Sequence, residues 1–92
     1  MKKTTVTKAQ LTKRTEHTRT SVAEQLLDAR TKLGLTQLAV AQAARIDRKT
    51  VNRIENEHFS PSMETFVRLC AVLEVKAETV LANANKQFKS GK

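Results

Sequence analysis

The fold of this chain is decided by residues 36–55, TQLAVAQAARIDRKTVNRIE. The stretch holds neither glycine nor proline, yet its apolar pattern breaks around Arg45, Ile46 and Asp47 and resumes in a new helical phase. Thr36 and Asp47 are both residue types that suit the position just before a helix. The sequence therefore predicts two short helices joined by an abrupt turn.

The composition favours an all-α fold. Of 92 residues, 39% are hydrophobic, with three Phe, two Gly and one Pro, which suits helices better than sheets. A chain of this length buries only about two thirds of its unfolded surface, so we expect one domain with a modest core. The apolar runs fall far short of the roughly 20 residues of a membrane span. Together with the single cysteine, Cys70, this predicts a cytoplasmic protein.

Apolar periodicity predicts five helices within residues 21–84. Ser21 and Glu24 have capping-box spacing and mark the expected start of the first helix, and Gly34 marks its end. Ser60 or Ser62 is expected to cap the fourth helix. The apolar stripes of the five helices comprise, in order, Val22, Leu26, Ala29 and Leu33; Leu38, Val40, Ala41 and Ala44; Val51 and Ile54; Met63, Phe66, Val67, Cys70 and Leu73; and Ala77, Val80, Leu81 and Ala84, with an extension to Phe88. We expect the end of the last stripe, from Leu81 to Phe88, to belong to the core, which is compatible with its also forming a dimer interface.

The net charge of +8 is carried by the two ends of the chain. Residues 1–20 are basic and rich in threonine and lack a periodic apolar face, so we expect a flexible arm. Residues 85–92 form a basic tail, whereas residues 21–84 hold eight basic and eight acidic side chains. Binding to a polyanion must therefore depend on these ends and on local placement. The arm either aids solubility or lies along the minor groove of DNA.

Within residues 48–56, the way in which basic and amide side chains share one helix face favours DNA binding. On a helical wheel Val51 and Ile54 define the buried side. The opposite side presents Lys49, Asn52, Arg53 and Asn56, with Arg48 at its flank. Such side chains donate hydrogen bonds to guanine and adenine edges and to phosphates, and no carboxylate interrupts the face.

Glu55 falls on the buried flank of the same wheel. Arg30 lies on the apolar side of the first predicted helix and is the candidate partner of this carboxylate. Breaking such a buried pair typically costs about 3 to 5 kcal/mol. We therefore expect a structural ion pair between Arg30 and Glu55.

The segment from Val22 to Leu81 resembles the Cro/C1-type helix-turn-helix domain of phage repressors and Xre-like bacterial regulators. The resemblance rests on LGLTQLAVAQAARIDRKTVNRIEN and SPSMETFVRLCAVLEV, about two thirds of the chain. It implies a five-helix lambda repressor-like domain whose third helix enters the major groove of double-stranded DNA. Arg45 and Glu57 stand where the family prefers glycine, so a non-glycine residue must tolerate a positive φ at the turn.

The resemblance also implies roles for individual residues. The base-reading candidates are Arg48, Lys49, Asn52 and Arg53, and the phosphate-binding candidates are Thr36, Gln37, Thr50, Asn56 and His58. The family's buried pair falls on Arg30 and Glu55. We expect a homodimer, with recognition helices about 34 Å apart on a pseudo-palindrome, that represses transcription by blocking a promoter.

Two other function classes fit the sequence. An antitoxin would autoregulate its operon through the same domain and bind a toxin protein, whereas an interaction module or nonspecific DNA-binding protein would use the fold without reading sequence. No catalytic arrangement, phosphate loop or metal-ligand set is evident, so neither an enzyme nor a cofactor is expected. Cys70 is expected to be buried, and His17 and His58 to be solvated.

Overall fold

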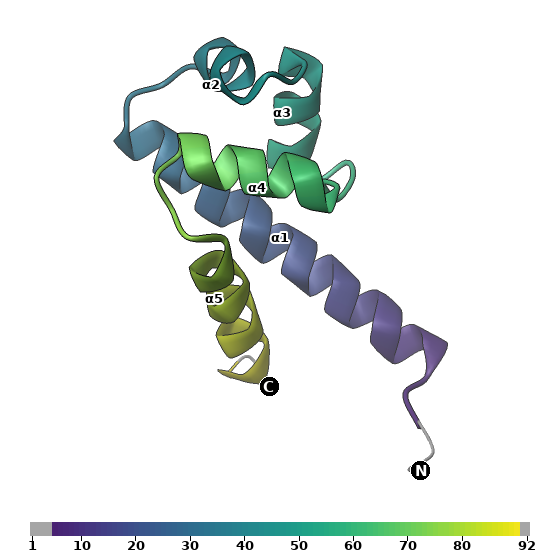
Figure 1. The fold of residues 1–92 in the computed structure, drawn as a ribbon. Coiled ribbons are helices and arrows are strands. Elements are labelled where there is room, and N and C mark those ends of the chain that lie inside the picture. Colours follow the sequence, from purple (N-terminus) through teal and green to yellow (C-terminus); the bar gives the residue numbers. More distant parts are fainter. Residues whose placement is uncertain (1–4, 91–92) are drawn as a thin grey trace.

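The computed structural model describes residues 5–90, with side chains for residues 5–86. Five helices and no strand occur in this described part, which confirms the all-α prediction (Figure 1). They are α1 (Lys8–Lys32), α2 (Gln37–Ala44), α3 (Arg48–Glu55), α4 (Met63–Val72) and α5 (Ala77–Ser90). None of the helices in residues 5–90 has the length and apolar character needed to cross a membrane.

The first helix begins thirteen residues earlier than predicted, at Lys8 rather than near Ser21. Its cap is Thr7, whose hydroxyl accepts from the Gln10 amide N–H at 3.1 Å while the Gln10 side chain accepts from the Thr7 N–H at 2.9 Å. Ser21 lies in the middle of α1 and is buried. The prediction of a start at Ser21 is therefore wrong, because the same capping chemistry occurs earlier in the chain.

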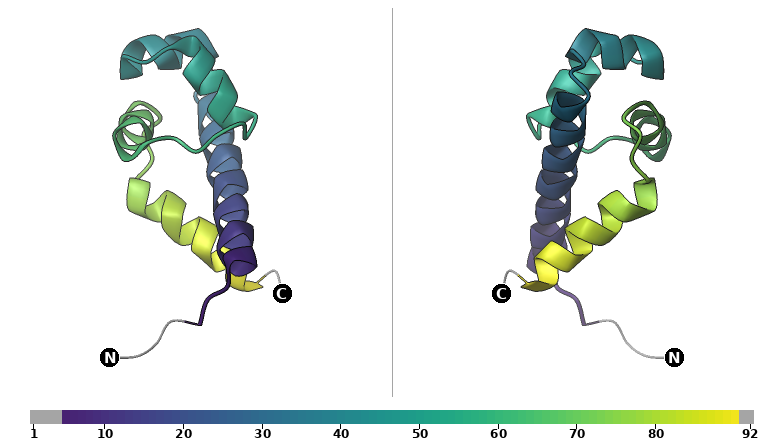
Figure 2. Two further views of the ribbon diagram at one scale, coloured as in Figure 1. Left: turned by 90° about the vertical axis from the view of Figure 1, so that its right-hand side faces the viewer. Right: turned by 90° about the vertical axis from the view of Figure 1, so that its left-hand side faces the viewer.

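The added turns of α1 lie against α5 (Figures 1 and 2). The Arg14 guanidinium donates to the Asn85 side-chain oxygen at 2.6 Å, and His17 Nε2 lies 3.2 Å from the Ala84 carbonyl oxygen. His17 is half-buried rather than solvated as predicted. Residues 8–20 are thus held as helix by contacts distant in sequence, in place of the expected arm without regular structure.

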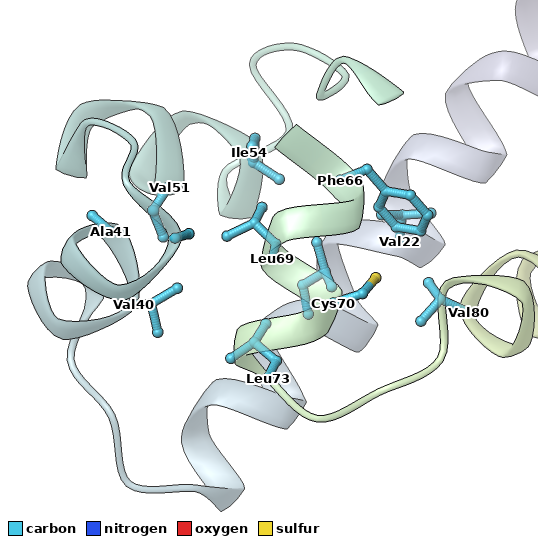
Figure 3. Packing of buried hydrophobic residues seen from close by; sticks show 12 residues of the cluster. Val22, Val40, Ala41, Val51, Ile54, Phe66, Leu69, Cys70, Leu73 and Val80 are labelled. Atoms are coloured by element: carbon cyan, nitrogen blue, oxygen red, sulfur yellow. The ribbon is translucent and has the colours of Figure 1, made fainter. Parts of the chain in front are cut away.

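All five helices contribute to one core (Figure 3). Leu26, Val40, Ile54, Leu69 and Val80 are each almost fully buried, one from each helix in chain order. Cys70 is buried among them, as predicted, and burial raises the pKa of its thiol. Because α2 and α3 have only eight residues each, this shared core sets their orientation.

Some members of the predicted apolar stripes are exposed instead. They are Leu33, Leu38, Met63, Val67 and Leu81. In α4 and directly after it, the buried residues are Phe66, Leu69, Cys70 and Leu73. Leu69 is therefore part of the core, whereas Met63 and Val67, which the spacing predicted to be buried, are not. The side chain of Phe88 lies outside the described residues.

The helix ends follow the sequence signals more closely. Gly34 ends α1 with a positive φ of 70°, which glycine adopts without strain. The Thr36 hydroxyl accepts from the Ala39 N–H at 3.0 Å and Ser62 caps α4 by accepting from the Thr65 N–H at 3.1 Å. Asp47 precedes α3 as predicted, although its side chain forms no capping hydrogen bond.

Candidate nucleic-acid interface

The turn between α2 and α3 depends on Arg45. This residue ends α2 in the left-handed conformation, with φ 61° and ψ 45°. The next N–H, of Ile46, donates to the Ala41 carbonyl at 2.9 Å, and the Ile46 side chain packs on the core. The turn is therefore as abrupt as the sequence indicates, at a cost of about 1 kcal/mol for a non-glycine residue with positive φ.

Helix α3 is anchored on one side and basic on the other. Val51 and Ile54 are buried in the core, whereas Arg48, Lys49 and Arg53 are exposed. In the described part of the chain none of these three cations forms an ion pair with a carboxylate. Helix α3 thus presents three hydrogen-bond donors whose positive charge no nearby carboxylate of the described residues neutralises, and such groups bind phosphates and guanine edges.

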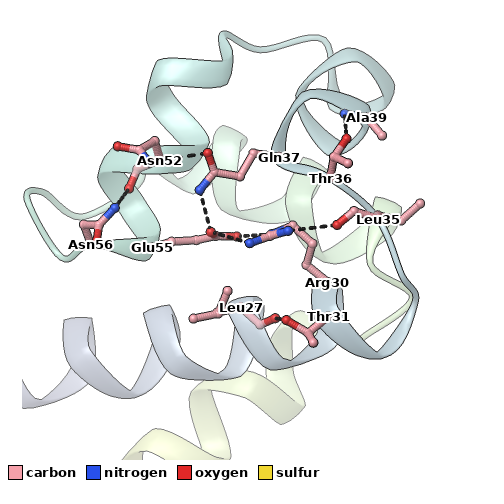
Figure 4. A network of polar contacts seen from close by, with 10 residues as sticks. All are labelled: Leu27, Arg30, Thr31, Leu35, Thr36, Gln37, Ala39, Asn52, Glu55 and Asn56. Atoms are coloured by element: carbon pink, nitrogen blue, oxygen red, sulfur yellow. Dashed lines mark hydrogen bonds and ion pairs between the residues drawn. The ribbon is translucent and has the colours of Figure 1, made fainter.

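Beneath this face Arg30 of α1 holds Glu55 of α3 (Figure 4). Arg30 Nε donates to Glu55 Oε2 at 2.6 Å and Nη2 donates to Oε1 at 3.0 Å, while Nη1 donates to the Leu35 carbonyl at 2.8 Å. Only 18% of the Arg30 side chain and 7% of the Glu55 side chain are exposed. The Glu55 hydrogen bond raises the pKa of Arg30. This is the contact that the helical wheel predicts, and it joins the ends of α1 and α3.

The same carboxylate positions Gln37 at the start of α2. Gln37 Nε2 donates to Glu55 Oε1 at 2.8 Å, and Asn52 Nδ2 donates to Gln37 Oε1 across 3.4 Å. Asn56 in turn donates its side-chain N–H to the Asn52 carbonyl at 2.8 Å. Gln37 and Asn52 are half-buried. Asn52 therefore differs from the three cations, because its amide is tied to α2 instead of extending freely.

The remaining phosphate candidates surround this network. The Thr36 hydroxyl oxygen is used as a helix cap, which leaves its proton available to donate. Thr50 is half-buried, and Asn56 and His58 are exposed. The structure thus places Thr36 and Gln37 at the start of α2, Thr50 on α3, and Asn56 and His58 directly after α3.

Sequence reasoning missed three contacts near the loops that flank α3. Arg68 of α4 pairs with Glu64 at 2.7 Å and also donates to the Arg45 carbonyl at 3.4 Å; only the spacing of four between Glu64 and Arg68 signals this in the sequence. Thr20 of α1 donates its hydroxyl to Glu57 at 2.6 Å. Glu57, with φ 63°, stands where the family prefers glycine, and its carboxylate is bonded to α1.

Among the described residues, no group of three or more histidine, cysteine or acidic side chains could hold a metal ion. Cys70 is a buried thiol. The main polar network joins α1, α2 and α3, and its contacts hold these three helices together. The side chains near α3 offer hydrogen-bond donors and positive charge.

Comparison with known proteins agrees with this geometry. A helix-turn-helix family model, HTH_3, matches residues 26–80. Among solved structures, the clp gene regulator ClgR from Corynebacterium glutamicum is similar, with a TM-score of 0.71 and 22% identity over 80% of this chain and 79% of that chain; at this identity the likeness shows the fold alone. No curated protein matches the sequence. Since the family match covers more than half of the chain, the protein belongs to the Cro/C1-type helix-turn-helix family of DNA-binding transcription regulators.

Proposed function

We propose that this protein is a cytoplasmic repressor that binds a pseudo-palindromic operator as a homodimer. The observation that carries the proposal is the exposed basic face of α3, whose three cations stand on a helix fixed from below by Glu55 and the core. A rigid support lowers the cost of ordering the side chains that meet the bases. This arrangement suits sequence-specific DNA binding better than non-specific binding to any polyanion.

In the proposed complex the N-terminal part of α3 lies in the major groove. Arg48, Lys49 and Arg53 contact base edges, and Asn52 contributes through its bond to Gln37. The phosphate contacts come from the start of α2 and from the residues on and after α3: Thr36, Gln37, Thr50, Asn56 and His58. Phosphate contacts at both ends would fix the angle of the helix, on which base selection depends.

The homodimer follows from the small size of the reading unit. Helix α3 has eight residues and is about 12 Å long at 1.5 Å per residue, so it spans only a few base pairs. Two copies related by a twofold axis, with contacts near the connection between α4 and α5, would place their α3 helices about 34 Å apart. Blocking of a promoter by the bound dimer is then sufficient for repression.

The test is a selection of bound sequences from random duplex DNA, with the parent protein and with Arg53→Ala. If Arg53 reads a base, the change should cost about 1 to 3 kcal/mol and relax preference at one position in each half-site. Lys86→Ala, a change of an exposed cation near the far end of α5, is the control and should leave selection unaltered. A uniform loss over all sequences would make Arg53 a phosphate contact, and no loss would refute the proposed interface.

The dimer has a separate test. Operator DNA titrated with protein in analytical ultracentrifugation should take up two chains per site. Insertion of about five base pairs between the half-sites turns them to opposite faces of the duplex and should abolish this paired binding. One chain per selected site, unaffected by the insertion, would rule out the homodimer and leave a monomeric reader.

A further inference from the structure

The residue just before α3 differs from the other helix caps. The caps of α1, α2 and α4 are Thr7, Thr36 and Ser62, and the hydroxyl of each accepts a hydrogen bond from a backbone N–H of its helix. Asp47 has the extended backbone of a cap, but its carboxylate accepts no such bond. Within the described residues it forms no ion pair either. The Asp47 side chain is therefore exposed, with its capacity to accept hydrogen bonds unused.

The two other carboxylates between residues 47 and 57 already have partners. Glu55 is paired with Arg30, and Glu57 accepts from the Thr20 hydroxyl at 2.6 Å. Both contacts tie these carboxylates to α1. Asp47 stands at the opposite, N-terminal end of α3, which is the end that the proposed complex places in the major groove. This position distinguishes its free carboxylate from the exposed acids elsewhere on the protein.

We propose that Asp47 selects cytosine in the operator by accepting a hydrogen bond from the exocyclic amino group of that base. The proposal rests on the proposed function, because it requires the start of α3 to lie in the major groove. There guanine presents two acceptors, thymine presents an acceptor and a methyl group, and adenine presents its donor beside an acceptor. Each of these acceptors repels a carboxylate. Cytosine presents a donor alone, so it is the base that suits a free carboxylate.

The same charge would reject other sequences. At a site without cytosine the Asp47 carboxylate loses contact with water and gains no donor in return. It also lies near phosphates, which repel it. The charges of Arg48, Lys49 and Arg53 attract any duplex through its phosphates. An acid beside these cations therefore lowers the affinity for wrong sites more than for the correct one, which raises specificity without raising general affinity.

Selection from random duplex DNA with Asp47→Ser and Asp47→Asn tests the proposal. Serine and asparagine cap helices as well as aspartate does, so both variants should unfold at the same urea concentration as the parent. The parent should select cytosine at one position in each half-site. Asp47→Ser should lose this preference by about fivefold or more. Asp47→Asn should prefer adenine there, because an amide both donates and accepts as the adenine edge requires.

The matched control is Glu16→Gln, which removes one exposed carboxylate from the first half of α1. It causes the same change in net charge and should select the same sequences as the parent. A loss of cytosine preference in this control as well would show that net charge, rather than the position of Asp47, causes the effect, and would overturn the proposal.

A second measurement removes the amino group from the DNA. A duplex with pyrimidin-2-one in place of the selected cytosine lacks this donor. The parent should bind it about fivefold more weakly than the cytosine duplex, whereas Asp47→Ser should bind the two duplexes equally. A role of Asp47 in orienting α3 would not couple one side chain to one amino group in this way.

The proposal is overturned if Asp47→Ser selects the same cytosines as the parent, or if loss of the amino group weakens both proteins equally. In either case the parent still selects a sequence, so the proposed function stands. If the parent selects no sequence at all, the proposed function fails and this proposal fails with it.

Discussion

Replacement of Glu55 with alanine tests the network beneath α3 directly. The change removes the acceptor of three hydrogen bonds, two from Arg30 at 2.6 and 3.0 Å and one from Gln37 at 2.8 Å. Loss of one partner of a buried pair costs about 3 to 5 kcal/mol, because the other charge keeps no counterpart. Arg30 retains its bond to the Leu35 carbonyl and some contact with water. We therefore expect the lower end of that range, about 3 kcal/mol.

Urea denaturation followed by circular dichroism measures this loss. For a domain of this size each kcal/mol lowers Tm by about 4 to 8 °C, so heating should show a fall of roughly 12 to 24 °C. The control is the double variant Arg30→Met with Glu55→Leu, which leaves neither charge buried and should regain most of the stability. A cost below about 1 kcal/mol for Glu55→Ala, the range of exposed pairs, would refute the claim that this pair is shielded from water.

The double variant also separates stability from DNA recognition. Its leucine at position 55 cannot accept from Gln37, so the amides of Gln37 and Asn52 lose the anchor that orients them. We expect a folded protein whose affinity for its selected operator is weaker by about 1 kcal/mol, the net value of one such hydrogen bond. Operator binding equal to the parent would show that the network serves folding alone.

Three further outcomes are expected. Arg45→Gly should raise the free energy of unfolding by about 1 kcal/mol in urea, because glycine accepts the positive φ of the turn, and Glu57→Gly should gain less because it loses the 2.6 Å bond from Thr20. Burial, and after it nearby Glu78, raises the pKa of the Cys70 thiol, so the thiol ionises at a lower pH in the unfolded chain than in the folded one. The free energy of unfolding should therefore fall as pH rises past about 8.5. Iodoacetamide should label Cys70 at about pH 8 only after unfolding. Lys49→Gln should weaken operator binding by about 1 to 3 kcal/mol and relax preference at one position in each half-site, as expected for a base contact, whereas Lys8→Gln should change neither because Lys8 lies at the far end of α1.

The helix-turn-helix could be predicted from sequence because its signals are local. Thr36 and Asp47 mark the starts of two helices, and a buried Val51 and Ile54 determine which way the rest of an eight-residue helix faces. Once that side is known, Glu55 must point back towards α1, where Arg30 is available. The bonds of Gln37 could not be read in this way, since they join residues 15 and 18 positions apart with no shared periodicity.

The start of α1 shows where local signals fail. Two capping boxes compete, Thr7 with Gln10 and Ser21 with Glu24, and the segment between them has no apolar stripe. The outcome depends on contacts with α5 made between the two boxes, such as the bond from Arg14 to the Asn85 side-chain oxygen at 2.6 Å, which no pattern within α1 encodes. The exposure of Met63 and Leu81 could not be predicted for the same reason. Spacing defines an apolar stripe, but the neighbouring helices decide how much of that stripe is covered.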